Sequence, residues 1–448
     1  MNYLVHSDED RKRILNELNI KEVTELFKSI PQNIIYPDLN LDEDIGEKEI
    51  IERITEISKK NVPISNFKSF IGGGAYNHYI PATVESIQSI SQFYTAYTPY
   101  QAEISQGTLQ YNFEFQSLIC RLTGMDVSNA SMYDAASATA EAILMAKRIN
   151  GKKKVLISDT VHPDYRMTVK TYCKYADIEL LEINSIEGST DLDNLNNSIN
   201  SILNDVAAVV IQNPNFFGCF EDVFKIKEIL SKSSDCLLIM VVNPLTLSLL
   251  KPPSEYGADI VVGDAQGFGC SLNFGGPYVG FFSTKKEYLR QMPGRIVGRT
   301  IDSKGNSAYV LTFQAREQHI RKYKATSNIC SNHSLNALAV TVYLATLGEK
   351  GLKENASLCL QKAHYLSERI IKECTNIKLK FNKMFFNEFV LECKKIDSLI
   401  SKLYEKNIIL GLPLKKYYSS LDDCILVTAT EMNSYSDIDF LIEAIKSS

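Results

Sequence analysis

The 448-residue sequence lacks the features that mark several large classes of protein. No apolar run reaches the roughly 18 residues that a membrane helix needs. The amino terminus, MNYLVHSDEDRKRIL, is polar and charged where a signal peptide has an apolar core. None of the ten cysteines forms a C-x-x-C pair, so we expect reduced and buried thiols. These absences predict a cytoplasmic protein that does not enter a membrane.

Positive charge is too sparse for a nucleic-acid-binding protein. The sequence holds 48 Lys and Arg residues against 53 Asp and Glu residues, for a net charge of −5. Non-specific nucleic-acid binding depends on clustered Lys and Arg, so we expect no nucleic-acid partner. A hydrophobic content of 45% and a charged content of 23% are ordinary for a globular chain. The length suits two or three domains.

Several common catalytic motifs are also missing. The six histidines are far apart in sequence and lack the spacing of metal ligands, so we expect no metal site. There is no Walker A loop and no G-x-S-x-G elbow. The glycine-rich loop after Gly263 leads into another strand instead of a helix, which argues against a dinucleotide site.

From Lys153 onward, apolar strands alternate with helical stretches. Strands about 25 residues apart, with helices between them, predict βαβ units and a mostly parallel sheet. A last strand, 278–282, follows too closely for a helical crossover, so we expect it to run antiparallel. The other expected elements are strands 155–157, 180–183, 206–211, 236–242 and 260–262 and helices 164–175, 192–203 and 223–230.

The sequence divides into three expected regions. Residues 1–60 predict an N-terminal helical arm, in which Ser7 and Asp10 form a capping box. Residues 61–330 predict a large α/β domain. Residues 331–448 predict an interdomain helix and a small C-terminal α+β domain. In the interdomain helix, Thr326, Ser327 and Asn328 are the expected caps, and Gly348 and Gly351 the expected end.

The stretch from Ala258 to Phe282 predicts a strand, a glycine-rich loop and a second strand. In a layered α/β domain, ligands bind at the loop that follows such a strand. Pyridoxal phosphate (PLP) chemistry there needs a lysine for the Schiff base, a carboxylate against the pyridinium nitrogen and a phosphate cradle. However, no lysine occurs between Lys251 and Lys285.

All three PLP-binding groups are missing from the places where this fold would put them. The place of the lysine falls near Gln266, and that of the carboxylate is taken by Asn243. The helix start that would hold the phosphate offers Ser137 and Thr139 without a glycine. An amide cannot hold the pyridinium proton as a carboxylate does. The three losses predict a PLP-type scaffold with no PLP and no catalytic residue of its own.

Two loops with many hydrogen-bonding groups precede the sheet. Residues 72–74 are a glycine triplet, which allows close backbone approach but also occurs in plain turns. Residues 94–107, YTAYTPYQAEISQG, hold three tyrosines with amide and carboxylate side chains. Such a loop either faces a ligand or subunit or is a solvated connection. For His78 and His162 we expect hydrogen-bonded structural roles.

Six long stretches carry a resemblance to a known family. They are FIGGGAYNHYIP, YTPYQAEISQG, TGMDVSNASMYDAASATAEA, LLKPPSEYGADIVVGDAQGFGCSLNFGGPYVGF, RQMPGRIVGRTIDSKG and REQHIRKYKATSNIC, all within residues 70–330. The chain resembles the PLP-free (alpha, N-terminal-type) subunit of glycine dehydrogenase (decarboxylating), the glycine cleavage system P-protein, in its two-subunit form. The resemblance covers essentially the whole chain and implies a PLP-dependent transferase type I-like fold.

The resemblance implies that this chain works only with a partner. In this family one subunit type holds PLP on the lysine of an H-K dipeptide. Counted back from Pro277, Ala265 and Gln266 stand where that dipeptide would be. The PLP-bearing partner decarboxylates glycine, and the aminomethyl group passes to the lipoyl group of the carrier H-protein. The resemblance further implies a heterotetramer of two unlike pairs, in which loops of one subunit reach the other's site.

Two groups of residues become candidates for contributing to the partner's active site. The first lies in the 94–107 loop and comprises Tyr97, Thr98, Tyr100, Gln101 and Glu103. The second could hold the cofactor phosphate or the acidic carrier, or could instead form a salt-bridge network. It comprises Arg316, His319, Arg321 and Lys324.

Two other interpretations stay open at this point. A self-sufficient PLP enzyme using an unexpected lysine would show an absorbance band that borohydride removes from the chain alone. A scaffold or regulator would keep turnover intact when the 94–107 loop is disabled, yet its removal would stop assembly of the complex.

Overall fold

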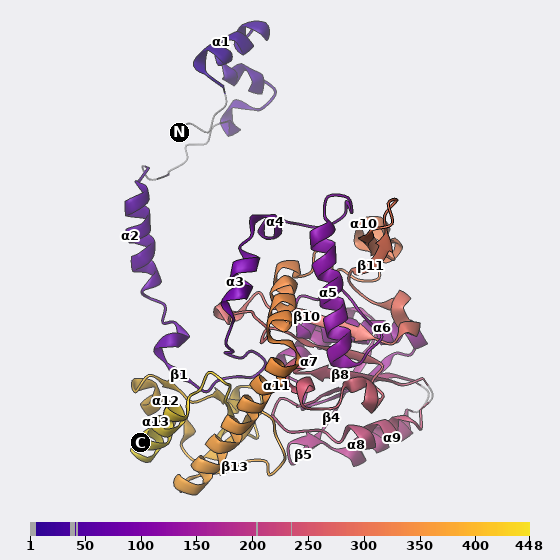
Figure 1. Ribbon diagram of the computed structural model, residues 1–448, viewed down its shortest axis with the longest axis vertical. Coiled ribbons are helices and arrows are strands. Elements are labelled where there is room, and N and C mark those ends of the chain that lie inside the picture. The colour runs from indigo at the N-terminus through magenta and orange to yellow at the C-terminus, as the bar shows by residue number, and fades with distance from the viewer. Residues whose placement is uncertain (1–5, 36–40, 42–43, 203–204, 234) are drawn as a thin grey trace. The chain divides into compact units, whose positions relative to one another are not determined.

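The structure is a computed structural model that describes residues 6–35, 41, 44–202, 205–233 and 235–448. The chain divides into two compact units, residues 1–63 and 64–448 (Figure 1). The predicted boundary near residue 330 does not separate these units, and the three-region division stays a prediction.

The described residues of the first unit form two α-helices. In α1 (Asp8–Glu17), the hydroxyl of Ser7 accepts from the backbone N–H of Asp10, whose carboxylate accepts from the N–H of Ser7, so the predicted capping box is confirmed. Helix α2 (Glu47–Ser58) buries none of its residues. Between them lie the 3-10 turns η1 (Val23–Phe27) and η2 (Gln32–Ile34). Residues 1–5, 36–40 and 42–43 of the predicted arm lie outside the described residues.

A seven-stranded sheet forms the centre of the second unit, with the order β2-β10-β9-β8-β7-β3-β4. The strands β4, β3, β7, β8 and β9 run parallel, and β10 runs antiparallel to β9. The mostly parallel sheet and the antiparallel last strand are thus confirmed. The bounds are β2 (Val127–Ser128), β3 (Lys154–Ser158), β4 (Glu179–Ile183), β7 (Val206–Gln212), β8 (Leu237–Val242), β9 (Ile260–Asp264) and β10 (Gly280–Thr284).

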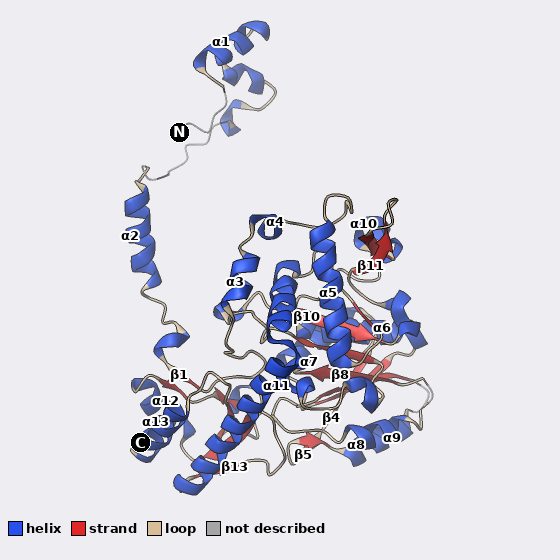
Figure 2. Ribbon diagram, in the orientation of Figure 1, coloured by secondary structure: helices blue, strands red, loops and turns tan. Residues whose placement is uncertain are grey.

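Helices cover both faces of this sheet (Figure 2). One face packs against α6 (Ala135–Asn150) and α7 (Pro163–Tyr175). The other packs against α5 (Gln106–Thr123), α8 (Leu192–Ser201), α9 (Val223–Leu230) and the first part of α11 (Ser334–Glu373). Strands buried on both faces must be continuously apolar. This explains why the strand bounds predicted from the sequence differ from the observed ones by about two residues or fewer.

Helix α6 brings its amino terminus to the edge of the sheet where β9 ends. Asp134 caps the helix by accepting from the backbone N–H of Ser137 at 2.7 Å, and Gly151 ends it in the left-handed conformation. The small buried residues Ala138, Ala140 and Ala142 let the helix pack closely on the strands. This local capping and composition therefore fix both the start of the helix and the face that it buries.

Helix α11 (Ser334–Glu373) differs from its prediction. It begins after His333, so the predicted capping by Thr326, Ser327 and Asn328 is wrong. Gly348 breaks the helical geometry with φ of 60°, so α11 consists of two helices that meet at a kink, and the predicted end of the first helix at Gly348 is confirmed. The second helix begins directly after Gly348 and includes Gly351. Leu352 and Ala356 pack into the same core as the first helix, which explains its early start.

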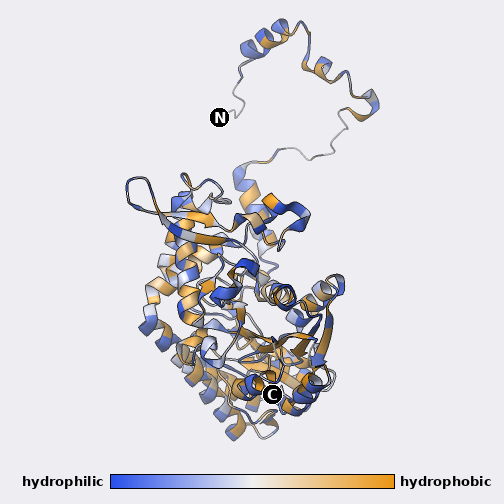
Figure 3. Cartoon of the chain, turned by 90° about the vertical axis from the view of Figure 1, so that its right-hand side faces the viewer, coloured by the Kyte–Doolittle hydropathy of each residue, from blue (hydrophilic) through white to orange (hydrophobic). Residues whose placement is uncertain are grey.

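The carboxyl-terminal part folds around a four-stranded sheet, as predicted for an α+β region. The sheet order is β13-β14-β17-β16. Apolar residues of this sheet and its helices share one core, which includes Phe70 from the distant segment after β1 (Lys68–Ser69). The helices of the chain carry both hydrophobic and hydrophilic residues (Figure 3). The bounds are β13 (Ile377–Leu379), β14 (Glu388–Cys393), α12 (Ile396–Glu405), β16 (Leu412–Pro413), β17 (Cys424–Thr428) and α13 (Tyr435–Lys446).

Shorter elements complete the second unit. Strand β1 (Lys68–Ser69) pairs in parallel with β15 (Ile408–Ile409), which ties the segment before the glycine triplet to the carboxyl-terminal region. The others are α3 (Ala82–Gln88), α4 (Ser91–Tyr94), the hairpins β5 (Ser185–Ile186) with β6 (Ser189–Thr190) and β11 (Ile296–Ile301) with β12 (Ser307–Thr312), and α10 (Gln318–Arg321). Among the described residues, none of the helices combines the length and hydropathy needed to span a bilayer.

Candidate functional site

A small cavity lies at the carboxyl ends of β8 and β9, the edge where sheets of this kind bind ligands. Its volume is only about 30 Å³, whereas small-molecule sites measure about 300–1,000 Å³. It can hold a water molecule but no cofactor ring. The residues around it include Tyr76, Tyr165, Asn243, Asp264 and Gln266.

Gln266, at the predicted place of the lysine, fastens two segments across this cavity. Its side-chain amide donates to the carbonyls of Tyr76 at 3.0 Å and Cys270 at 2.8 Å. Its oxygen accepts from the backbone N–H of Tyr76 at 2.8 Å. Gln266 is only 2% exposed. The side chain therefore acts as a structural clasp beside the cavity.

A buried carboxylate holds the glycine triplet against the carboxyl-terminal sheet. Glu388 accepts from the backbone N–H of Gly73 at 2.8 Å, from the hydroxyl of Tyr76 at 2.7 Å and from that of Thr428 at 2.9 Å. Burial raises the pKa of Glu388. A Cβ on Gly72 would lie 2.1 Å from the Thr428 hydroxyl oxygen, so the triplet permits a close approach that other residues would block.

His162 supports the same segment from the other side. Its Nδ1 accepts from the backbone N–H of Asp164 at 3.1 Å, so Nε2 carries the proton and donates to the carbonyl of Gly73 at 2.7 Å. Burial lowers the pKa of His162, and its ring stacks on Tyr165 with centroids 4.4 Å apart. The histidine is a neutral structural group, as expected from the sequence.

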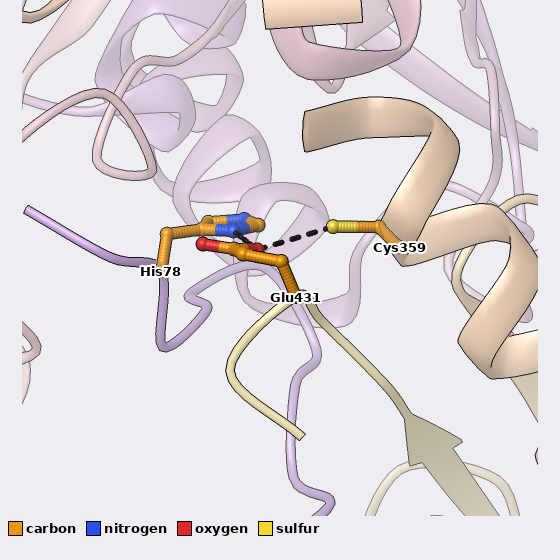
Figure 4. A group of neighbouring side chains, drawn as sticks. All are labelled: His78, Cys359 and Glu431. Atoms are coloured by element: carbon orange, nitrogen blue, oxygen red, sulfur yellow. Dashed lines mark hydrogen bonds and ion pairs between the residues drawn. The ribbon is translucent and has the colours of Figure 1, made fainter. Parts of the chain in front are cut away.

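His78, Glu431 and Cys359 meet from three distant segments next to the cavity (Figure 4). The carboxylate of Glu431 contacts Nδ1 of His78 at 2.7 Å and Sγ of Cys359 at 3.2 Å, and accepts from the N–H of Tyr79 at 2.6 Å. Burial opposes ionisation of Glu431, but His78 holds its pKa below the usual value. The three donor atoms lie within 4.8 Å of one another, yet they satisfy each other. The group is complete as a hydrogen-bonded network without an ion.

Asp264 places a carboxylate beside the cavity that sequence reasoning did not single out. It accepts from the backbone N–H of Gln266 at 2.9 Å and from that of Ala135 at 3.3 Å. Burial raises its pKa to about 7. Together with Asp134, it caps the start of α6, where a phosphate was expected to bind. The two carboxyl groups already accept from the backbone N–H groups of Ala135 and Ser137, so these donors at the helix end are not free for a phosphate.

The cavity of this chain therefore does not fit PLP. The described residues around it include no lysine, and its volume is about 30 Å³. The acidic caps of α6 occupy the phosphate position. Asn243, at the predicted carboxylate position, turns its oxygen to the backbone N–H of Leu245 at 3.1 Å.

The first candidate group lies on the surface and away from the cavity. Tyr97 is 81% exposed and Tyr100 is 46% exposed, while Gln101 and Glu103 are also exposed. The hydroxyls of Tyr97 and Thr98 each lie 3.2 Å from the Ser331 hydroxyl. The loop is thus ordered by the 330–331 segment and presents aromatic side chains outward. None of these residues contacts the cavity.

The second candidate group is not one cluster. Arg316 turns inward and donates to the carbonyl of Met292. The ring of His319 lies 4.8 Å from that of Tyr100. Arg321 and Lys324 are exposed, and Arg321 donates to the carbonyl of Ala315 at 2.9 Å. The structure therefore brings His319 to the 94–107 loop and leaves Arg321 and Lys324 at the surface.

Comparisons with known proteins decide the family. The sequence model described as "Glycine cleavage system P-protein" matches residues 1–445. The chain belongs to this P-protein family. Among curated P-protein relatives, "Probable glycine dehydrogenase (decarboxylating) subunit 1" of Carboxydothermus hydrogenoformans is 46% identical over 446 residues, covering 99% of both chains. The relative of the same name from Desulfitobacterium hafniense is 47% identical over 444 residues, covering 99% of this chain and 98% of its own.

Solved structures confirm the predicted PLP-dependent transferase fold of this P-protein chain. A crystal structure of glycine decarboxylase (P-protein) in an inhibitor-bound form matches with a TM-score of 0.90 at 38% identity, covering 100% of both chains. A structure of C-DES with glycine linked to its PLP cofactor matches with a TM-score of 0.62 at 12% identity, covering 85% of this chain and 97% of its own. The second likeness shows the fold alone.

Restoring a lysine at the clasp of this P-protein chain will not restore cofactor binding. Gln266→Lys is expected to bind no PLP, because the cavity is too small for the ring and acidic groups cap α6. Loss of the clasp will also loosen the 72–80 segment. Absorbance spectra and borohydride reduction of the purified variant check this. A PLP absorbance band in Gln266→Lys that is absent from a Gln266→Met control would show that the cavity accepts PLP and would contradict this prediction.

Asp264 predicts a pH dependence of stability. Its folded pKa of about 7 lies above the ordinary value of 3.8, so the folded state holds a proton that the unfolded chain releases. The free energy of unfolding should therefore fall as pH rises from about 4 to 7, by about 3 kcal/mol between pH 5 and 8. Urea unfolding of Asp264→Asn should show a flatter pH profile. Asp302→Asn is a control, because the pKa of the exposed Asp302 is lowered and so lies below this pH window.

Proposed function

We propose that this chain is the non-PLP subunit of a two-subunit glycine cleavage P-protein. Together with a PLP-bearing partner subunit it decarboxylates glycine. The same complex transfers the aminomethyl group to the lipoyl group of the H-protein. The observation that carries the proposal is the small cavity beside which Gln266, at the predicted place of the lysine, joins Tyr76 to Cys270. The chain alone is proposed to be inactive.

The contribution of this chain is proposed to lie on its exposed loops. The 94–107 loop keeps several tyrosines at the surface although their rings are large and apolar. Aromatic side chains with a polar end are typical of contact surfaces. In the proposal Tyr97, Thr98, Tyr100, Gln101 and Glu103 complete the partner's active site. Arg316, His319, Arg321 and Lys324 are a second proposed contributing group.

The cofactor arrangement and assembly are part of the same proposal. PLP belongs to the partner, and the lipoyl group on the H-protein is the acceptor. The relatives named "subunit 1" support the existence of a partner subunit. A heterotetramer of two unlike pairs in the cytoplasm is proposed from the family resemblance.

Co-expression with the lysine-bearing subunit tests the proposal. The expected result is a stable complex that catalyses glycine–bicarbonate exchange, while neither chain does so alone. Adding lipoylated H-protein should then permit net glycine decarboxylation. Exchange by this chain alone, or a lysine-bearing subunit whose activity does not change on mixing, would reject the proposed division of labour.

The loop assignment has its own test. Tyr100→Phe combined with Gln101→Ala in the reconstituted complex should lower kcat/KM for glycine–bicarbonate exchange by about tenfold or more, as expected when two active-site hydrogen bonds are lost. Gel filtration should show unchanged assembly. A matched control is Tyr175→Phe, since Tyr175 is 80% exposed at the end of α7. Exchange at the wild-type rate in the double variant would reject the loop's role.

A further inference from the structure

Three arginines near residues 291–295 have guanidinium donors without an acceptor among the described residues, and one of them, Arg295, contacts Tyr100 of the 94–107 loop. Arg295 precedes β11 and is 2% exposed. Arg148, near the end of α6, donates to the carbonyl of Gln291 at 3.0 Å, and Arg316 donates to the adjacent carbonyl of Met292. Burial lowers the pKa of Arg316 to about 10, and Arg148 lowers it further while Glu317 raises it, so both charges lie close to Arg316. Arg295 joins the group through Glu317, whose carboxylate lies 3.4 Å from its Nε.

Most of the remaining guanidinium donors have no acceptor among the described residues. The buried atoms without a hydrogen-bond partner include Nη1 of Arg295, Nε and Nη2 of Arg316, and Nε of Arg148. Nε of Arg295 also lacks one, although the Glu317 carboxylate lies 3.4 Å away. A buried charged donor without an acceptor is costly, and native proteins satisfy nearly all such groups. Acceptors from outside this chain would meet that need.

The local charge is positive. Two carboxylates accompany the three guanidinium groups, those of Glu141 and Glu317. Burial raises the pKa of Glu141, so its ionisation offsets less of the positive charge. One oxygen of each carboxylate also lacks a hydrogen-bond partner. The group therefore carries an excess of at least one positive charge together with several free N–H donors, which suits an oxyanion.

An aromatic lid covers Arg295 on the side of the candidate loop. The Tyr100 hydroxyl accepts from Nη2 of Arg295 at 3.1 Å, and its ring lies 5.0 Å from the guanidinium carbon. His319 packs on the outer side of Tyr100, with ring centroids 4.8 Å apart. The same Nη2 also lies 3.6 Å from Sγ of Cys330. Because Tyr100 is 46% exposed, movement of Tyr100 together with His319 would open Arg295 to a ligand from a neighbouring subunit.

We propose that Arg148, Arg295 and Arg316 form an oxyanion site, covered by Tyr100 and His319 in the free chain, that receives the phosphate group of the partner's PLP. The inference rests on the proposed function, because the phosphate comes from the partner's site. Arg295 contacts the phosphate, and Arg316 and Arg148 supply the second layer of donors and charge. Guanidinium groups suit this task because their planar forks bind phosphate oxygens in pairs. Free inorganic phosphate offers the same oxyanion chemistry.

The test compares PLP with pyridoxal, which lacks the phosphate. Complexes of wild-type, Arg295→Gln and Arg290→Gln chains with the PLP-bearing subunit are stripped of cofactor and titrated with each compound, with binding followed by absorbance. Arg290 is an exposed control five positions away. In Arg295→Gln the dissociation constant for PLP should rise about ten- to hundredfold. That for pyridoxal should stay within about twofold, as expected when no phosphate interaction is lost.

Several outcomes would overturn the proposal. The first is an unchanged PLP dissociation constant in Arg295→Gln together with no stabilisation of the chain by inorganic phosphate. The second is an equal loss of affinity for PLP and for pyridoxal. The third is a rise in the KM for glycine with no change in PLP affinity, which would mean that the site binds the glycine carboxylate. Circular dichroism and gel filtration establish that the variant folds and assembles. If Arg295→Gln does not assemble, Arg316→Gln, a less buried member of the group, takes its place and is expected to raise the PLP dissociation constant in the same selective way.

A second arm distinguishes the source of the phosphate and the fate of the proposed function. Inorganic phosphate is titrated into the chain alone, and thermal stability is measured. Stabilisation that Arg295→Gln abolishes, with unchanged PLP affinity in the complex, would keep the oxyanion site but assign it to free phosphate. If the proposed function is wrong, the wild-type chain will form no complex with the PLP-bearing subunit. If only this inference is wrong, the complex will form, but Arg295→Gln will not weaken PLP binding more than pyridoxal binding.

Discussion

Replacing Glu388 with alanine should destabilise the 64–448 unit by about 3 kcal/mol or more, because three buried donors each lose their acceptor. These donors are the backbone N–H of Gly73 and the hydroxyls of Tyr76 and Thr428. They connect the glycine triplet with β14 and β17, so the variant should also loosen the segment that closes the cavity. The midpoint of urea unfolding, followed by far-UV circular dichroism, measures the loss.

A glutamate on the same strand provides the control. Glu392 lies four residues along β14 and pairs with Lys378 at 3.0 Å and Lys380 at 3.4 Å in partly exposed positions. Such pairs contribute about 0–1 kcal/mol, so Glu392→Ala should shift the midpoint little. Equal shifts in the two variants would mean that Glu388 does not hold the segment in place.

Gly218→Ala should have an effect of similar size for a different reason. A Cβ there would lie 2.0 Å from the backbone oxygen of Glu388, and Gly218 has a φ of +82°. Overpacking and a left-handed backbone together cost about 2–5 kcal/mol. Because the clash is with a backbone atom of β14, no side-chain rotation relieves it. Thermal unfolding of the purified variant measures the loss.

Gly151→Ala separates the backbone effect from the clash. Gly151 has a φ of +73°, but a Cβ there would meet nothing within 4 Å. Its cost should be that of the left-handed conformation alone, about 1–2 kcal/mol. If the alanine variants at 151 and 218 lost the same stability, the close approach between Gly218 and β14 would not be a strong constraint.

The sheet was predictable because its pattern is local and repeated. Strands such as 206–212 are buried along nearly their whole length, so each appears in the sequence as a continuous apolar run. The capping boxes at Ser7 and Asp134 are equally local. The start of the second helix of α11 directly after Gly348 was harder, because it depends on Leu352 and Ala356 packing into the core. That packing has no local signal.

The candidate site was predictable only as an absence. The lysine-free stretch indicated Gln266, but its partner Tyr76 lies 190 residues away, and Tyr76 reaches Glu388 across 312 residues. Asp264 could have been noticed as the acidic end of an apolar strand. Arg295 had no such signal, because its meeting with Tyr100 spans 195 residues. Long-range contacts of this kind follow from the fold and cannot be obtained from spacing.

The structure also shows how this chain satisfies the polar groups of the cavity without a lysine. The cavity is filled by hydrogen bonds of Gln266, Tyr76 and Asp264, and His78 joins Glu431 beside it. A cavity that held a cofactor would leave unpaired polar groups when the cofactor was lost. Here the side chains satisfy each other, while unpaired donors gather under Tyr100. The two regions thus differ in what they need from outside the chain.

The most direct test of the central proposal is to find which chain carries the cofactor. The reconstituted complex with PLP is reduced with borohydride, which fixes PLP on the lysine that holds it, and the peptides of both chains are mapped by mass spectrometry. We predict pyridoxyl-lysine in the partner subunit and none in this chain. A pyridoxyl-lysine in any peptide of this chain, at an amount matching its own active sites, would contradict the proposal.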